Sequence, residues 1–353
     1  MLDSVRDRSL GGPASASAEG KVLIATHGAG RGRRTGFLIE LLKRIATQRP
    51  HASEKVVAWL TGTPLPSLDR VRAIIFMLGD PITHYPLCHA EARSLARAAR
   101  ERGIQLINPP FALNNSVKSR QAALWKEAGL PCAGGEQASD EAELRALIVR
   151  ARYPIILRFD DYHQQDGVAV CRNEAEALEW TLANQRYPAA VLEYIDTRDS
   201  WRRAQPGTIF ADYFHKRRSM VFGSKVLNNH IFFSLNPIVG SKTSTFGEAH
   251  RGGQPNRIDE MVEADIAYSW SPPEQPELMQ AAVRALGLGM AAIDYSTRAD
   301  GSIVLWEANP FFQLPHWSLG LLAKPRRLEE RLPALMDSMI DELEELAGGS
   351  ADG

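Results

Sequence analysis

The sequence is poor in cysteine and contains no long hydrophobic run. Its 353 residues include three cysteines, Cys88, Cys132 and Cys171, which lie far apart and lack the spacing of metal ligands. They predict neither a disulfide framework nor a zinc site, and they suit a protein of the reducing cytoplasm. The longest apolar runs are too short to span a bilayer. Segment 1–20 is rich in Ser, Ala and Gly without the apolar core of a secretory signal, so we expect it to be disordered.

An excess of charge of either sign is also missing, since the formal net charge is −1. This balance argues against a global basic footprint for nucleic acid and against a polybasic membrane signal, and we expect neither partner. Two small basic clusters, at 31–34 and 216–218, read most simply as solvated surface. With 44 % hydrophobic residues the chain can bury a large core, and its length indicates two or three domains.

Strands and helices alternate over residues 21–112. Apolar segments at 21–25, 56–60, 73–78 and 104–107 predict strands, and an Ala-rich helix is expected over 89–102. This alternation predicts a parallel, doubly wound α/β unit.

The character of the sequence changes after residue 112. Helices are predicted to begin near 114–116, at Asp140, where Glu143 completes a capping box, and at Asn173. Strands are predicted at 153–159, 167–172 and 189–195, and antiparallel strands within 213–234. The polar, glycine-containing segment 237–258 is expected to be a loop, and further helices are expected over 275–286 and 326–346.

The strongest motif is a predicted hairpin at 291–310. Two apolar runs flank Asp300-Gly301, a short-range hairpin signal. Glu307 and Asn309 are two positions apart on one strand and so point to one face, and Asp294 can face them from the other strand. Two carboxylates and an amide oxygen among apolar residues suit a hard divalent cation bound with a nucleotide's phosphates. The alternative is a surface hairpin with polar residues pointing outward, which the apolar neighbours make a poorer fit.

Two cations and one loop are candidates for contact with phosphate. Lys118 lies in the first turn of its predicted helix, where the macrodipole disfavours a cation. Its ammonium group therefore either binds a phosphate or points into solvent. Arg158 ends an apolar strand and needs a buried carboxylate or a phosphate. The glycine-rich segment 28–32 matches neither the dinucleotide fingerprint nor the phosphate loop, so it is either an anion-binding loop or a tight turn. His163, in the loop 160–167, is either an acid or base or simply exposed.

Taken in their order along the chain, these candidate residues resemble the ATP-grasp superfamily of carboxylate–amine and carboxylate–thiol ligases. D-alanine–D-alanine ligase is a familiar relative. The segment from Asn108 through Lys118 to Pro131 resembles the family's lysine-bearing helix, and 153–158 resembles its phosphate-binding strand. The resemblance is best over 288–310. It implies a parallel-sheet pre-ATP-grasp domain at 21–112, followed by two subdomains with mainly antiparallel sheets, at 113–190 and 191–346.

The resemblance also implies a reaction and a set of site residues. A carboxylate would attack the γ-phosphate of ATP to form an acyl phosphate, and an amine or another nucleophile would then displace phosphate from it. Mg²⁺ or Mn²⁺ would be the metal, and small molecules the substrates. The implied metal ligands are Asp294, Glu307 and Asn309; the implied nucleotide contacts are Lys118, Arg158, Glu193, Tyr194, Ile195 and Asp199; Arg217 or Arg218 would stabilise the acyl phosphate. A homodimer is compatible with this family.

Two other functions stay open. Arg158 stands where the family usually has lysine, and Ala292 where the dipeptide ligases have arginine, so a non-catalytic or regulatory nucleotide-binding protein of the same fold is an alternative. An NAD-dependent oxidoreductase built on 21–60 fits the glycine spacing poorly and leaves the hairpin unexplained.

Overall fold

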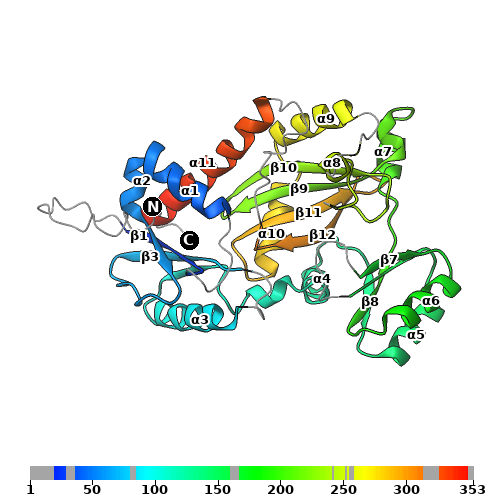
Figure 1. Cartoon of the computed structure of the whole chain (residues 1–353), viewed down its shortest axis with the longest axis horizontal. Helices are drawn as coiled ribbons and strands as arrows, with labels where there is room; N and C mark the ends of the chain where they lie inside the picture. The colour runs from blue at the N-terminus through cyan, green and yellow to red at the C-terminus, as the bar shows by residue number, and fades with distance from the viewer. Residues whose placement is uncertain are drawn as a thin grey trace, which may run out of the picture.

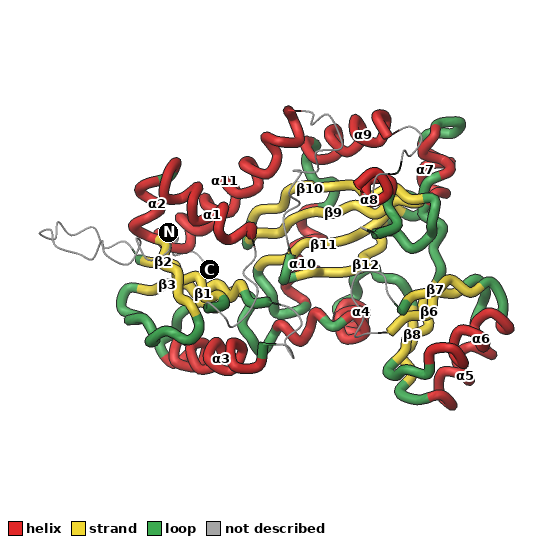
Figure 2. The backbone as a smooth tube through the Cα atoms, in the orientation of Figure 1, coloured by secondary structure: helices red, strands yellow, loops and turns green. Residues whose placement is uncertain are grey.

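The computed structural model describes residues 20–28, 36–79, 85–159, 167–240, 242–250, 253, 258–312 and 326–348. These residues form three four-stranded sheets, which Figure 2 shows as three separate groups of strands. Within the described ranges, no helix combines the length and hydropathy needed to cross a membrane.

The first sheet is parallel, with the order β2-β1-β3-β4. On β1, Val22 and Ile24 pack against α1 and α11, whereas Leu23 and Ala25 pack on the other face, in the cluster that contains α3. Burial on both faces explains the continuous apolar runs, and the predicted doubly wound unit is confirmed. The elements are β1 (Lys21–Thr26), α1 (Gly36–Gln48), α2 (Pro50–Lys55), β2 (Val56–Leu60), β3 (Val71–Met77), α3 (Pro86–Glu101) and β4 (Gln105–Ile107).

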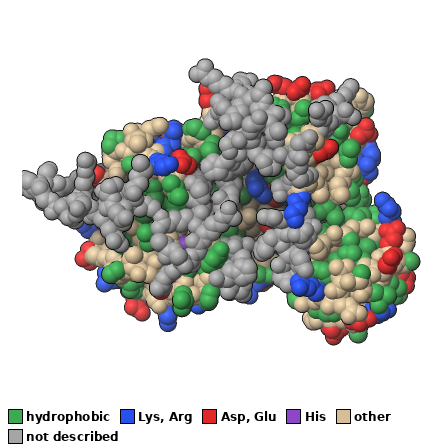
Figure 3. All heavy atoms as spheres, viewed as in Figure 1, with side chains coloured by type: hydrophobic (Ala, Val, Ile, Leu, Met, Phe, Trp, Pro, Cys, Tyr) green, Lys and Arg blue, Asp and Glu red, His purple; other side chains and the backbone are tan. Residues whose placement is uncertain are grey.

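The second sheet is antiparallel, with the order β5-β8-β6-β7, and forms a lobe with α5 and α6 (Figures 1 and 3). The predicted N-cap is present, since Glu143 N donates to Asp140 Oδ1 at 2.9 Å. The return bond differs from a capping box, because Glu143 Oε2 accepts at 2.7 Å from Ser139 N, one residue before the N-cap. The elements are η3 (Leu113–Ser116), α4 (Lys118–Glu127), β5 (Gly135–Ala138), α5 (Glu141–Arg150), β6 (Ile155–Phe159), β7 (Val168–Cys171), α6 (Glu174–Asn184) and β8 (Ala189–Glu193).

The third sheet is antiparallel, with the order β10-β9-β11-β12. One face packs on α10, and α11 covers part of the other face while also packing on β1, so it joins the first and third sheets (Figure 1). The elements are α7 (Arg198–Ala204), η4 (Ile209–Asp212), β9 (Phe214–Phe222), β10 (Lys225–Ser234), α8 (Thr245–His250), α9 (Ile258–Trp270), α10 (Pro276–Ala285), β11 (Met290–Thr297), β12 (Ile303–Asn309) and α11 (Arg326–Gly348). The mixed α/β architecture agrees with the predicted fold class.

The expectation of a loop throughout 237–258 is wrong, because α8 lies within this segment and α9 begins at its end. The few apolar residues of this region fall on one side. Phe246, Met261 and Ile266 pack on Ile231 and Phe233 of β10. A polar segment can be helical when its sparse apolar residues share a face.

Asn108 fixes the first sheet to the third. It follows β4 with a positive φ of 52° and is buried. Its Nδ2 donates to Met290 O at 2.8 Å, and its Oδ1 accepts from Gly289 N at 3.1 Å and Met290 N at 3.0 Å. The side chain therefore satisfies three backbone groups at the start of β11.

We expect Asn108→Ala to lower the free energy of unfolding by about 4 kcal/mol or more. The substitution strands buried backbone groups, at about 1–3 kcal/mol each, and puts alanine in the left-handed region, at about 1–2 kcal/mol. Asn108→Gly is the matched control, because glycine tolerates this φ but lacks the hydrogen bonds. Urea unfolding should rank wild type above Gly and Gly above Ala; equal losses in the two variants would contradict the backbone contribution.

Candidate functional site

The predicted hairpin exists and is buried. Strands β11 and β12 pair antiparallel, with Asp294 opposite Glu307 and Ala292 opposite Asn309. Residues directly opposite share a face, as do positions two apart on a strand, so Asp294, Glu307 and Asn309 lie on one face of the sheet. Asp294 is only 2 % exposed, which excludes an outward-pointing surface hairpin.

Two cations of the neighbouring strand β9 hold the Asp294 carboxylate. Arg218 Nε and Nη2 donate to Oδ1 and Oδ2 at 2.6 and 3.0 Å, and Lys216 Nζ lies 2.8 Å from Oδ2. Burial alone would raise the pKa of Asp294, but the charges of Arg218 and Lys216 outweigh it and hold that pKa well below its ordinary value. Asp294 is therefore ionised and fixed in position at neutral pH.

Arg217 and Arg218 lie on opposite faces of the sheet, because adjacent residues of a strand alternate. Register places Arg218 opposite Asp294 and Arg217 opposite Tyr295. Of the two candidates for stabilising an acyl phosphate, Arg218 is the one beside Asp294. Arg217 instead donates to Glu274 and Thr297, away from that face.

The donor types on this face, two carboxylates and an amide oxygen, are those that Mg²⁺ prefers. Among the described residues, the half-buried Glu307 carboxylate makes no hydrogen bond or ion pair. Burial lowers the pKa of Arg218, but Asp294 and, after it, Glu307 outweigh burial and raise this pKa above its ordinary value. Asn309 Oδ1 accepts from Phe311 N at 2.8 Å, which fixes the amide and leaves its oxygen a second lone pair. No cluster of three or more His, Cys, Asp or Glu side chains suited to a metal occurs in the described ranges, and the set here has two carboxylates and an amide. A metal ion bound to Asp294 would share the carboxylate with Arg218 and Lys216.

The open edge of β12 is held by Gln121 of α4. Gln121 is buried, its Nε2 donates to Ala308 O at 2.8 Å, and its Oε1 accepts from Ala308 N at 2.8 Å. Ala308 lies between Glu307 and Asn309, so Gln121 completes the hydrogen bonding of the backbone that carries both side chains.

We therefore expect Gln121→Met to weaken magnesium-dependent nucleotide binding by about tenfold or more, as the loss of a supporting shell does at other metal sites. Isothermal titration with ADP, with and without Mg²⁺, measures this effect. Gln280→Met is the control, because Gln280 bonds Ser224 O in the β9–β10 turn. An unchanged magnesium dependence in Gln121→Met would reject the positioning role.

Lys118 and Arg158 come together beside β12. Both line a cavity of about 40 Å³ whose walls include Leu192 of β8 and Leu305 and Trp306 of β12. Lys118 is the first residue of α4, as predicted, and Arg158 lies on β6. This space is smaller than a nucleotide.

The segment after β8 crosses from the second to the third sheet. Glu193 is bonded by Arg298, at 3.0 and 3.3 Å, and by Gly134 N at 3.2 Å, and these hydrogen bonds, Arg298 first, lower the pKa of Glu193 despite partial burial. Tyr194 and Ile195 are half-buried, and burial raises the pKa of Tyr194. Asp199, in the first turn of α7, pairs with Arg202 at 2.9 Å.

The sequence prediction missed Lys216 and Gln121. Alternation along a strand signals that Lys216 shares a face with Arg218, whereas nothing local signals the contact of Gln121 with β12. Gly28 N donates to Thr61 Oγ1 at 3.0 Å, and a Cβ at Gly28 would lie 1.9 Å from Thr61 O, so this glycine is required by close backbone approach. The rest of the glycine-rich segment, together with His163 and most of its loop, lies outside the described residues.

Comparison with solved structures identifies the fold. The chain is similar to the ATP-grasp ligase PsnB complexed with minimal precursor, Mg and ADP, at 13% identity and a TM-score of 0.54, with 92% of this chain and 98% of that chain covered. It is also similar to a Chryseobacterium gregarium RiPP-associated ATP-grasp ligase in complex with ADP and a leader and core peptide, at 13% identity and a TM-score of 0.53 over 93% and 96% of the two chains. A RimK domain protein ATP-grasp from Sphaerobacter thermophilus matches at 17% identity and a TM-score of 0.50 over 91% and 99%.

The protein therefore has the ATP-grasp fold. No family model and no curated protein matches the sequence.

Proposed function

We propose that this protein is a Mg-ATP-dependent ligase that activates a carboxylate as an acyl phosphate for attack by an amine or another nucleophile. The observation that carries the proposal is the charged face of the third sheet, where Asp294, Glu307 and Asn309 lie beside Arg218 and Lys216. The ATP-grasp fold of neighbours complexed with ADP and Mg supports it.

Each residue has a role in this proposal. Asp294, Glu307 and Asn309 would hold Mg²⁺, which when bound neutralises phosphate charge. Lys118 and Arg158 would hold phosphate oxygens across the cleft, and Glu193, Tyr194 and Ile195 the adenine, with Asp199 near the ribose. Arg218 would stabilise the acyl phosphate by a preorganised positive charge, which costs no reorganisation during the reaction.

Water exclusion follows from how the lobe meets β12. The narrow space between Arg158 and Trp306 would open for the nucleotide and close on it, which would protect the acyl phosphate from hydrolysis.

The test has two stages. Stabilisation of the protein by ATP that depends on Mg²⁺ supports the nucleotide site, and its absence would reject the proposal. Release of ADP and phosphate with pooled carboxylates and amines then separates a ligase from a non-catalytic nucleotide-binding protein. Peptides belong in the pool, because two of the similar structures contain precursor or core peptides.

A further inference from the structure

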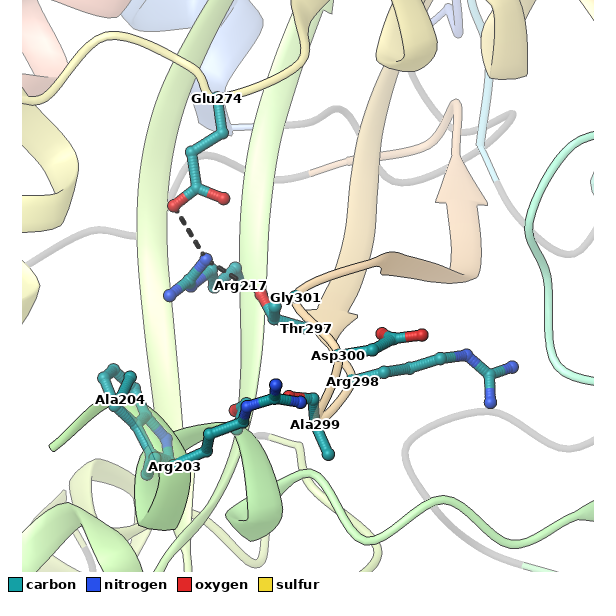
Figure 4. Close-up of a pocket in the computed structure, with 11 residues that line it drawn as sticks. Arg203, Ala204, Arg217, Glu274, Thr297, Arg298, Ala299, Asp300 and Gly301 are labelled. Carbon is teal, nitrogen blue, oxygen red and sulfur yellow. Dashed lines mark hydrogen bonds and ion pairs between the residues drawn. The ribbon is translucent and has the colours of Figure 1, made fainter. Parts of the chain in front are cut away.

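A second cavity lies at the other face of the third sheet. It has a volume of about 370 Å³ and is lined by α7, the β11–β12 turn and the loop before α10 (Figure 4). Arg217 lies in its wall, on the face opposite to Arg218 and Asp294. The sheet backbone therefore separates this cavity from the charged face, and none of the roles given above uses it.

Two buried donors of this cavity's wall have no acceptor in the part of the chain that the structure describes. Within that part, Arg217 Nε and Trp201 Nε1 are both buried without a hydrogen-bond partner. Nδ1 of the neighbouring His215 is also buried and has no partner among the described residues. The His215 ring packs edge-on against the Trp201 ring, with 5.0 Å between the ring centroids. Buried polar groups normally have partners, so unpaired donors concentrated at one cavity point to a ligand that supplies acceptor oxygens.

The guanidinium of Arg217 is preorganised. It lies 5.7 Å from the Trp201 ring centroid and 5.8 Å from that of Tyr268, and its side chain is only 14 % exposed. Thr297 Oγ1 accepts from Nη1 at 3.1 Å. The rings and the threonine hold the charge in one place, so a ligand loses little entropy in meeting it.

Glu274 occupies the position of an anionic ligand. Its carboxylate accepts from Arg217 Nη1 at 3.0 Å, and Figure 4 shows it pointing into the cavity wall toward Arg217. The Glu274 side chain is 55 % exposed, so its pairing is weak and exchangeable. A second carboxylate or a phosphate could replace it on Arg217.

The remaining charges of the wall are balanced while Glu274 is in place. Arg203 Nη1 donates to Ala299 O at 3.0 Å, and Arg298 pairs with Glu193. Since Arg298 is neutralised in this way, Arg203 and Arg217 remain against Glu274 and Asp300. When Glu274 is displaced, the wall gains a net positive charge, which favours an anion.

We propose that this cavity binds a small molecule carrying a carboxylate or phosphate group, which replaces Glu274 on Arg217, while a flat apolar part lies against Trp201. Its volume is at the lower end of the range for small-molecule sites, about 300–1,000 Å³. Arg298 connects the wall to Glu193 at the end of β8, so a bound anion would act on the segment that crosses between the second and third sheets.

Titrations of the full chain with benzoate and with inorganic phosphate test the site. The readout is the indole N–H signal of Trp201 in a ¹H–¹⁵N spectrum, assigned by its loss in Trp201→Phe. This signal reports the cavity itself, so it is informative whether or not the protein binds nucleotide. We expect at least one anion to shift it saturably; benzoate alone identifies a carboxylate ligand with a flat group, and phosphate alone a phosphate ligand.

Two variants should move the affinity in opposite directions. Glu274→Gln removes the internal competitor and should tighten binding about two- to fivefold. Trp201→Phe keeps a ring but removes the donor and should weaken binding about three- to tenfold, measured by calorimetry. Absence of a saturable shift with both anions, or the same affinity in Glu274→Gln as in the wild type, would overturn the proposal.

Discussion

Replacing Glu307 with glutamine is expected to lower ADP release by roughly 10²–10³-fold while the fold stays intact. Glu307 is half-buried and, among the described residues, its carboxylate has no hydrogen bond or ion pair, so the fold loses only its longer-range attraction to Arg218. Glutamine has the same shape and keeps one oxygen, but it removes a negative charge from a set that would bind Mg²⁺. The loss should therefore appear in metal-dependent steps.

The measurements are ATP-dependent thermal stabilisation across a series of Mg²⁺ concentrations and ADP release in the pooled-substrate assay. In Glu307→Gln the stabilisation by ATP should lose most of its dependence on Mg²⁺, whereas the melting temperature without nucleotide should hardly change. Glu277→Gln, in the exposed first turn of α10, is the control for the substitution itself. A variant with the same magnesium dependence as the wild type would remove Glu307 from the metal site.

The hairpin could be predicted because its signals are local. The turn at Asp300-Gly301 fixes which residues meet, and alternation along each strand fixes which side chains share a face. Apolar neighbours then indicated burial, and Asp294 is indeed buried. The N-cap at Asp140 and the parallel first sheet follow from short patterns of the same kind.

The partners of Asp294 could not be predicted in this way. The cluster 216–218 reads as solvated surface, yet Lys216 and Arg218 are ion-paired to a residue 76 or more positions later in the chain. Which face of β9 meets Asp294 depends on the β9–β11 register, which is set by packing across the sheet. The same holds for Gln121, whose two bonds to Ala308 span 187 positions.

Weakly patterned elements were also missed. Strand β5 reads Gly-Glu-Gln-Ala and has one buried residue, so neither propensity nor alternation indicates a strand, and its pairing with β8 decides its conformation. Helix α7 has seven residues with none buried, and is joined to the hairpin turn by the bond from Arg203 to Ala299 O. Both elements are determined by contacts that are distant in the sequence.

Replacing Arg218 with methionine should lower the free energy of unfolding at about pH 7 by roughly 3–5 kcal/mol, the range for breaking a buried ion pair. The substitution removes both hydrogen bonds from Arg218 to a buried carboxylate and leaves Lys216 as its remaining ion-pair partner. Lys216→Met, which removes one ion pair from a side chain that is 17 % exposed, should cost less. Urea unfolding followed by circular dichroism measures both losses.

The stability lost in Arg218→Met should depend on pH through the ionisation of Asp294. In the folded wild type the pKa of Asp294 lies below the ordinary value of 3.8, so ionised Asp294 stabilises the fold above that pH, and this contribution is lost as the pH falls below it. Burial raises the pKa of Asp294, and in Arg218→Met chiefly Lys216 opposes this effect, so the pKa of Asp294 should be higher than in the wild type. The stability difference between wild type and variant should then be largest near neutral pH and should shrink below about pH 4.

A double variant shows whether the loss belongs to the pair. Asp294→Asn in the Arg218→Met background removes the carboxylate that the first change leaves undercompensated, so the double variant should regain part of the lost stability. If the two changes were simply additive, Asp294 would not depend on Arg218 for its burial. A regained stability together with a lost magnesium dependence would separate the ion-pair role of Asp294 from its proposed metal role, because the ion pair acts on the fold and the proposed metal would act on nucleotide binding.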